Sequence, residues 1–182
     1  MKKVPYHLVL FPDGNRRWAK KKGLPIFKGH FYGYQNLKKF TRWCRKRGIK
    51  ILTAFGFSSE NWKRSKTEVN FLMKFFERGL SNKKDMNSLH KAGVKVKIIG
   101  QKYKLPKSLQ EVIKKVENLT KNNKKFQLNL AVSYGGRWDI LQAVKKIIKE
   151  KTPIKEITEN LIEKYLTTAG LPLPDLVIRA GG

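Results

Sequence analysis

Short apolar segments alternate with longer amphipathic ones along this 182-residue chain, and that alternation limits the folds it can adopt. Between the short segments, apolar residues recur at helical spacing, as in Val69, Leu72 and Phe76. Strands that alternate with helices predict an α/β fold, in which helices cover both faces of a mostly parallel central sheet. The short segments predict strands at residues 4–11, 49–57, 94–99, 126–132 and 176–178.

Residues that favour helix ends mark the boundaries of the predicted helices. Gly48 ends the helix that contains Phe31 and Cys44. Residues 65–68 have the sequence of a capping box, which would begin one helix. Pro106 can begin a later helix, which contains Leu109 and Ile113. A further short helix is expected near residues 161–166. The sequence has no repeat, linker or low-complexity block, so we expect one domain over residues 1–182.

The residues that follow the predicted strands share one chemistry. Ligands of open parallel sheets bind beyond the carboxyl ends of the strands, so these loops are the place to look for a site. Four of the loops combine small or hydroxyl residues with an arginine, which suggests an anion pocket at this edge of the sheet. These loops lie at residues 12–17, 58–64, 133–139 and 179–182.

The charge of the chain is strongly positive. A net charge of +28 favours anionic partners, namely phosphates, nucleic acid or acidic lipid headgroups. Most of the excess consists of scattered lysine pairs, which are typical of a solvated surface. The single cysteine excludes an internal disulfide, and we found neither an ordinary signal peptide nor an apolar stretch that could cross a bilayer. We therefore expect a cytoplasmic protein, for which contact with a membrane surface remains an option.

The turn Asp13-Gly14-Asn15 precedes two arginines that can offer forked donors to phosphate oxygens. An acidic residue in such a basic loop has two explanations. Asp13 could hold Mg²⁺, which proteins bind through one or two carboxylates plus substrate phosphates. Alternatively, Asp13 only stabilises a turn, as Asp-Gly sequences often do.

Other candidates carry weaker signals. A lone histidine such as His30 is more often structural than catalytic. Trp18, Trp62 and Trp138 are expected to form pocket walls. The aromatic pair Phe71 and Phe75 lies off the main apolar stripe of its helix, which indicates either a broadly buried helix or an apolar channel. The sequence shows no zinc-ligand spacing, Walker-type loop or hydrolase triad.

Five ordered blocks resemble those of the cis-prenyltransferases, and the undecaprenyl diphosphate synthases are the most similar in pattern. The resemblance extends from the first predicted strand to the last residue. The blocks are residues 7–19, 29–30, 57–64, 129–139 and 175–179.

The resemblance implies a Mg²⁺-dependent homodimer that adds isopentenyl diphosphate to an allylic diphosphate such as farnesyl diphosphate, with the product in a hydrophobic tunnel. It assigns Mg²⁺ to Asp13 and help in proton removal to Asn61. The substrate-binding residues that it implies are Gly14, Asn15, Arg16, Arg17, Trp18, His30, Ser58, Trp62, Arg64 and Arg179.

The sequence departs from the family pattern at two places. Family members often have an arginine four residues before the histidine, where this chain has Ile26, and Lys28 could replace only part of its charge. Family members also continue beyond the turn at Gly182 with a segment that contributes to the second substrate site and the dimer. We therefore expect residues 1–182 to lack the C-terminal segment of the family.

Three functions remain open at this stage. The first is an active chain-elongating prenyltransferase. The second is a catalytically impaired prenyl-diphosphate binder or partner subunit. The third is a nucleic-acid-binding module, which only the net charge supports and for which the sequence has no motif.

Overall fold

The computed structural model describes residues 4–181, which form five parallel strands and seven α-helices. The sheet has the strand order β3-β4-β2-β1-β5, and each neighbouring pair is parallel. The strands are β1 (His7–Pro12), β2 (Ile51–Ser58), β3 (Val94–Ile99), β4 (Phe126–Tyr134) and β5 (Leu176–Ala180). The α-helices are α1 (Asn15–Lys21), α2 (Ile26–Lys46), α3 (Lys66–Ser81), α4 (Lys83–Lys91), α5 (Lys107–Thr120), α6 (Gly136–Lys149) and α7 (Glu159–Tyr165). The predicted α/β class is confirmed.

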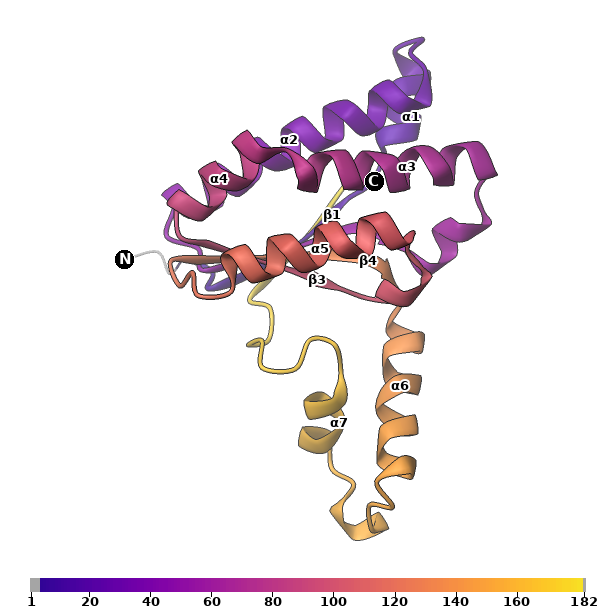
Figure 1. Ribbon diagram of the computed structural model, residues 1–182, viewed down its shortest axis with the longest axis vertical. Coiled ribbons are helices and arrows are strands. Elements are labelled where there is room, and N and C mark those ends of the chain that lie inside the picture. The colour runs from indigo at the N-terminus through magenta and orange to yellow at the C-terminus, as the bar shows by residue number, and fades with distance from the viewer. Residues whose placement is uncertain (1–3, 182) are drawn as a thin grey trace.

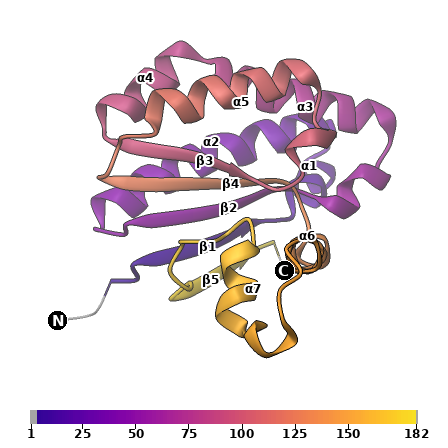
Figure 2. The ribbon, with the colours of Figure 1, turned by 60° about the horizontal axis from the view of Figure 1, so that its bottom comes forward.

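The helices divide unequally between the two faces of the sheet. Helices α2 to α5 lie over one face, whereas α6 and α7 lie on the other side (Figure 2). Helix α6 points away from the sheet instead of lying along it (Figure 1). Helices therefore flank both faces, as predicted, but they cover the second face only in part.

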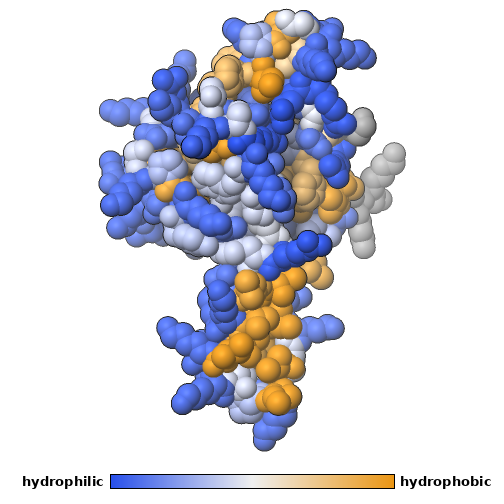
Figure 3. Space-filling model, turned by 90° about the vertical axis from the view of Figure 1, so that its right-hand side faces the viewer, coloured by the Kyte–Doolittle hydropathy of each residue, from blue (hydrophilic) through white to orange (hydrophobic). Residues whose placement is uncertain are grey.

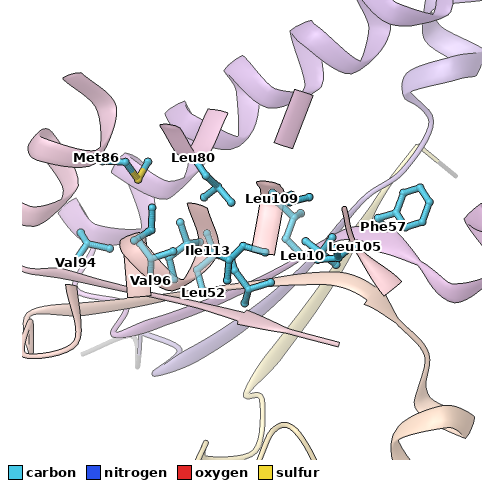
Figure 4. Close-up of a cluster of buried hydrophobic side chains, with 14 of the residues drawn as sticks. Leu10, Leu52, Phe57, Leu80, Met86, Val94, Val96, Leu105, Leu109 and Ile113 are labelled. Carbon is cyan, nitrogen blue, oxygen red and sulfur yellow. The ribbon is translucent and has the colours of Figure 1, made fainter. Parts of the chain in front are cut away.

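The hydrophobic core lies between the sheet and helices α3 to α5. Leu109 and Ile113 of α5 are buried against Val96 of β3, and Leu52 of β2 lies in the same cluster (Figure 4). At about 25 cal/mol per Å² of apolar area buried, side chains of this size contribute about 2 kcal/mol each. This cluster therefore fixes strands β2, β3 and β4, and with them the edge at which the strands end.

The bounds of β2, β4 and β5 differ from the predicted ones by one or two residues, and three further predictions need correction. Strand β1 begins at His7 instead of residue 4, because Pro5 has no N–H to give to a ladder. Helix α4 was not predicted, since Met86 is its only buried residue among those described. The predicted capping box is only half formed. The Ser65 hydroxyl accepts the Glu68 N–H, but the Glu68 side chain does not return to residue 65.

Among residues 4–181, none of the helices is both long enough and apolar enough to cross a membrane.

Candidate active site

The parallel pairing of β1 with β5 brings two distant loops together. In this register Phe11 lies beside Arg179 and Pro12 beside Ala180, so the turn after β1 meets the end of β5. The backbones approach closely there, because a Cβ on Gly14 would lie 3.0 Å from the Gly181 Cα. Gly14 has a φ of 84°, which glycine adopts without strain. The glycine therefore allows the turn after β1 to pack directly on the end of β5.

Asp13 is the centre of this meeting point. Its Oδ1 accepts the Gly14 N–H at 2.7 Å, and its Oδ2 accepts a hydrogen bond from Arg179 Nη2 at 2.9 Å. Arg17 lies 4.0 Å from the same Oδ2 and donates to the Gly181 carbonyl. The bond from Arg179, followed by the Gly14 N–H, holds the pKa of Asp13 below its usual value. Asp13 is therefore an ionised, solvent-accessible carboxylate between two guanidinium groups.

A second charged cluster surrounds Glu68, a residue that the sequence analysis did not identify as functional. Its carboxylate is almost fully buried at the start of α3, where Oε1 accepts from Arg64 Nη1 at 2.9 Å. His30 Nε2 lies 3.3 Å away and Arg16 Nε lies 3.8 Å away. Three predicted substrate-binding residues from three separate segments thus converge on one carboxylate, which sets their positions.

His30 is neutral in this cluster at neutral pH. Burial of its ring lowers the pKa below the usual value, and the contact with Glu68 opposes that shift only in part. A neutral imidazole has one donor and one acceptor nitrogen, so with Nε2 facing Glu68 its other nitrogen is left for a second hydrogen-bond partner.

Helices α1 and α2 pack closely enough to fix the first loop. A Cβ at Gly33 would lie 2.5 Å from the Asn15 Oδ1, and one at Gly29 would collide with the Asn15 carbonyl oxygen. Asn15 therefore fills the contact between the helices, and its amide donates to the Pro12 carbonyl at 3.3 Å. The same packing aligns Arg16 and Arg17 on α1.

The loop after β2 is held by its own side chains. The Ser58 N–H donates to Asn61 Oδ1 at 3.1 Å, within a capping box that opens the short 3₁₀-helix Ser59–Lys63. Trp62 donates from Nε1 to Ser133 Oγ at 2.8 Å and packs edge-on against Phe57. These contacts make Trp62 a wall residue that joins the loops after β2 and β4.

Several expected site residues lie outside these two clusters. Trp18 packs against the Tyr32 ring of α2 and is partly exposed. Asp139, in the first turn of α6, is buried and accepts from the Thr167 N–H and hydroxyl, so its role is to fix the chain after α7. Arg137 is exposed and forms no ion pair among the described residues. The loop after β4 therefore contributes contacts to Trp62 but no arginine to the clusters.

An apolar cavity of about 350 Å³ extends from the clusters between α2, α3 and the sheet. His30 and Asn15 line it near the strand ends, and Leu72 and Phe75 line it from α3. Phe71 instead packs against Phe27 of α2, with ring centroids 4.4 Å apart. The second aromatic set of α3 therefore divides between the cavity wall and the seam of the two helices, which supports the predicted channel.

The donor set around Asp13 suits Mg²⁺ only if a substrate supplies further oxygens. Within residues 4–181 no three His, Cys, Asp or Glu residues gather as a metal site. One accessible carboxylate beside phosphate-binding arginines is, however, the arrangement in which Mg²⁺ is held jointly by protein and phosphates. The residues present are thus compatible with this ion.

Comparisons with known proteins agree with this geometry. A family model described as undecaprenyl diphosphate synthase matches residues 11–182. A farnesyl-diphosphate-specific ditrans,polycis-undecaprenyl-diphosphate synthase of Legionella pneumophila is 42% identical over 99% of this chain and 76% of its own length. A geranylgeranyl-diphosphate-specific tritrans,polycis-undecaprenyl-diphosphate synthase of Pyrococcus abyssi is also 42% identical, over 98% of this chain and 69% of its own length.

Solved structures give the same result. Lavandulyl diphosphate synthase from Lavandula x intermedia, crystallised with dimethylallyl diphosphate, superposes with a TM-score of 0.91 at 36% identity, over 97% of this chain and 77% of its own. A probable undecaprenyl diphosphate synthase from Campylobacter jejuni gives a TM-score of 0.75 at 32% identity, over 98% of this chain and 76% of its own.

Proposed function

This chain belongs to the undecaprenyl diphosphate synthase family of cis-prenyltransferases, and we propose that its two diphosphate substrates meet at the sheet edge around Asp13 and Arg179. The chain is a prenyltransferase that condenses isopentenyl diphosphate onto an allylic diphosphate to give a polyprenyl diphosphate. The observation that carries the site assignment is the contact of Arg179 with Asp13, which joins the first and last family blocks in one place.

The allylic diphosphate binds beside α1 in this proposal. Arg16 and Arg17 provide forked donors, and the turn at Gly14 and Asn15 allows phosphate oxygens to approach the backbone. When the allylic carbon–oxygen bond breaks, both electrons leave with the diphosphate and negative charge accumulates on it. Arginines that are already in place stabilise that charge without reorganisation. His30 and Arg16 both contact Glu68, so the histidine lies in the same diphosphate region.

Asp13 provides a carboxylate for Mg²⁺ in this half of the site. Asp13 would hold the ion together with diphosphate oxygens, and the ion would supply positive charge as the leaving group forms. Arg179 donates to one oxygen of Asp13, so the ion would share this carboxylate with the guanidinium group.

The isopentenyl diphosphate binds between the loop after β2 and the end of β5. Arg64 and Arg179 offer guanidinium groups, Ser58 offers a hydroxyl, and Trp62 limits the volume of the site. After the new carbon–carbon bond has formed, the condensed cation loses a proton. An amide is not a base, so Asn61 would assist this step by orienting the phosphate oxygen or water that takes the proton. Trp18 would contribute a wall at the outer rim.

The growing hydrocarbon extends into the cavity between α2 and α3. Its walls are largely apolar, with Leu37, Leu72 and Phe76 among them. Such walls keep water from the allylic cation, which would otherwise be hydrolysed.

We also propose a homodimer that covers the outward face of α6. Ile140, Leu141, Val144 and Ile148 are exposed along this helix. Figure 3 shows a hydrophobic band over this part of the molecule. Contiguous apolar surface of this kind marks interaction sites in proteins. Sedimentation should give a dimer for the unchanged chain and a monomer for Leu141→Asp, while Lys145→Asp on the same helix should leave the dimer intact.

Contact with a membrane surface is the last part of the proposal. Trp18, Phe31 and Tyr32 form one exposed aromatic group on α1 and α2, and Lys20 to Lys22 follow Trp18 closely in the sequence. Aromatic rings flanked by lysines favour the interface of an anionic bilayer. Co-sedimentation with vesicles of phosphatidylglycerol should fall for Trp18→Ser/Phe31→Ser and be absent with vesicles of phosphatidylcholine alone.

The decisive experiment is an elongation assay with farnesyl diphosphate, labelled isopentenyl diphosphate and Mg²⁺. Labelled polyprenyl diphosphate is expected, and omission of Mg²⁺ should abolish it. Calorimetry with farnesyl diphosphate separates the alternatives. Binding without product at any protein concentration would identify an impaired prenyl-diphosphate binder, whereas steeply salt-dependent binding of any DNA would indicate a general polycation.

A further inference from the structure

Three polar side chains line the apolar cavity and join helices α2 and α4. Lys38 Nζ donates to both oxygens of Asp85, at 2.8 and 2.7 Å, and the Tyr34 hydroxyl donates to Asp85 Oδ2 at 3.2 Å. Burial of the phenol and the adjacent Asp85 carboxylate raise the pKa of Tyr34 to about 12, so the hydroxyl stays protonated and donates. We call Tyr34, Lys38 and Asp85 the clasp.

The clasp is part of the cavity wall and not of the outer surface alone. Its three members line the cavity together with Leu37 and Met86. Lys38 and Asp85 are each only partly accessible, with 33% and 24% of their side chains exposed. Paired charges can remain beside an apolar lumen, but a charge that loses its partner there becomes costly.

The position of the clasp along the cavity bears on the length of a bound chain. His30 and Lys38 lie on the same helix, eight residues apart, which is about 12 Å at 1.5 Å per residue. A short prenyl chain with its diphosphate near His30 would therefore reach the clasp, and a longer one would have to pass it.

An aromatic seam continues from the clasp toward the site. The Tyr34 ring meets Phe75 edge-on at 5.4 Å, Phe75 stacks on Phe71 at 5.5 Å, and Phe71 meets Phe27 at 4.4 Å. These rings close the space between α2 and α3 by side-chain contact. Tyr34 belongs to both the seam and the clasp, so opening the clasp also loosens the end of the seam.

We propose that the clasp determines product length, because it resists the passage of the growing prenyl chain out of the cavity. A chain that extends past this point must separate Lys38 and Tyr34 from Asp85 or turn away from them. Each further condensation beyond that length is therefore slower, while the first condensations are unaffected. This inference rests on the proposed prenyltransferase function and adds the residues that set its product specificity.

The test replaces the clasp by apolar side chains of similar length. In Lys38→Met/Asp85→Leu, the main product of the elongation assay should lengthen by at least one isoprene unit, with an unchanged rate for the first condensation. Tyr34→Phe removes one hydrogen bond and keeps the ring on Phe75, so its shift should be smaller and in the same direction. Lys39→Met is the matched control, because Lys39 is exposed on the same helix outside the clasp, and its products should equal those of the unchanged chain.

A binding series provides a readout that does not depend on turnover. Calorimetric affinity should rise from farnesyl to geranylgeranyl diphosphate and then level off for a longer prenyl diphosphate in the unchanged chain. In the double variant the affinity should continue to rise by severalfold. If circular dichroism shows that the double variant is unfolded, Tyr34→Phe alone decides. Folded variants with unchanged products and an unchanged affinity series would overturn the role of the clasp, whereas failure of every prenyl diphosphate to bind would remove the proposed function itself.

Discussion

The site joins two regions of very different construction: a body formed by residues 7–134 and an arm formed by residues 136–181. Almost all of the buried apolar residues belong to the body, and they enclose β2, β3 and β4 between helices and sheet neighbours. Among the described residues of the arm, only Ala143 and Ile147 are buried apolar residues, and residues 151–181 are all partly or fully exposed. Half of the proposed active site is therefore supported by a packed core, and the other half by an exposed strand.

Polar contacts attach the arm where apolar burial is missing. Asp175 Oδ2 accepts the N–H groups of Tyr6 and His7 at 2.9 and 2.8 Å, just before β5 begins. Asp139 holds Thr167, and Arg179 holds Asp13. Hydrogen bonds are directional and so fix the geometry of a segment, but each adds only about 1 kcal/mol to the free energy of unfolding. The arm can therefore be well placed and still open more easily than the body.

Asp13→Ala should have the largest effect, because Asp13 is the point at which body and arm meet. We expect kcat to fall roughly a thousandfold, as for the loss of a preorganised charged group at a developing charge. Stability should change little, since the side chain is half exposed. Single-turnover kinetics and thermal unfolding measure the two effects. Asp13→Asn keeps the bond to the Gly14 N–H and should be as inactive; near-normal turnover in either variant would contradict the metal-binding role.

Glu68→Ala should lower both the stability of the body and the enzyme activity, unlike Asp13→Ala, which should lower activity alone. Removing a buried carboxylate that pairs with Arg16 and Arg64 and contacts His30 should cost about 3 kcal/mol of unfolding free energy. Urea unfolding measures this cost, and KM for the allylic diphosphate should rise as the arginines lose their positions. Glu111→Ala, at an exposed position of α5, is the control and should change neither quantity. A fully stable and active Glu68→Ala variant would show that the cluster has no positioning role.

Asp139→Ala should affect the arm alone. The loss of two hydrogen bonds to Thr167 from a buried carboxylate should cost about 2 kcal/mol. Amide hydrogen exchange should accelerate in α6, α7 and β5 but stay unchanged in β2 and β4. Leu109→Ala provides the contrast, since a core cavity should destabilise every strand by about 3 kcal/mol. Equal loss of protection in body and arm for Asp139→Ala would refute the division into two regions.

A fall in pH should weaken the attachment of the start of β5, and this effect should be smaller than those of the substitutions above. Hydrogen bonds from the His7 and Tyr6 amides lower the pKa of Asp175 below its usual value. A depressed carboxyl pKa means that the stabilisation is present above the unfolded value near 3.8 and is lost as pH falls through the folded value. Asp175→Asn should remove this pH dependence from the exchange of the two amides. If the unchanged chain and the variant respond alike, Asp175 does not anchor the arm.

The strands and the location of the site were predictable because both depend on local patterns. The apolar segments at 94–99 and 126–132 needed only local sequence, and β3 matches its prediction residue for residue. The loops at the strand ends followed from the rule that parallel strands end at one edge. That rule correctly predicted that Asp13, Arg64 and Arg179 lie at the same edge, but it did not predict which residues they contact.

Features that depend on distant partners were not predictable. Glu68 has a local signal, since it shares a helix face with Leu72 and Phe76 at a spacing of four residues, and a charge on an apolar face requires a partner. The sequence does not say that this partner is a cluster of Arg16, His30 and Arg64. Helix α6 was recognised by its apolar stripe, but periodicity shows only that a face becomes covered and not what covers it.

The pairing of β5 with β1 also has a consequence for the order of folding. Asp13 and Arg179 are separated by 166 positions in the sequence, so their contact closes a loop that contains all of the body except β1. Non-local contacts of this kind form late, because the entropy of closing the loop must be overcome first. The body can assemble around α5 and β4 while the arm is still being synthesised. The sheet edge at Asp13 and Arg179 should thus fold after the body. A ribosome-bound chain would have a folded core before the residues of the proposed site come together.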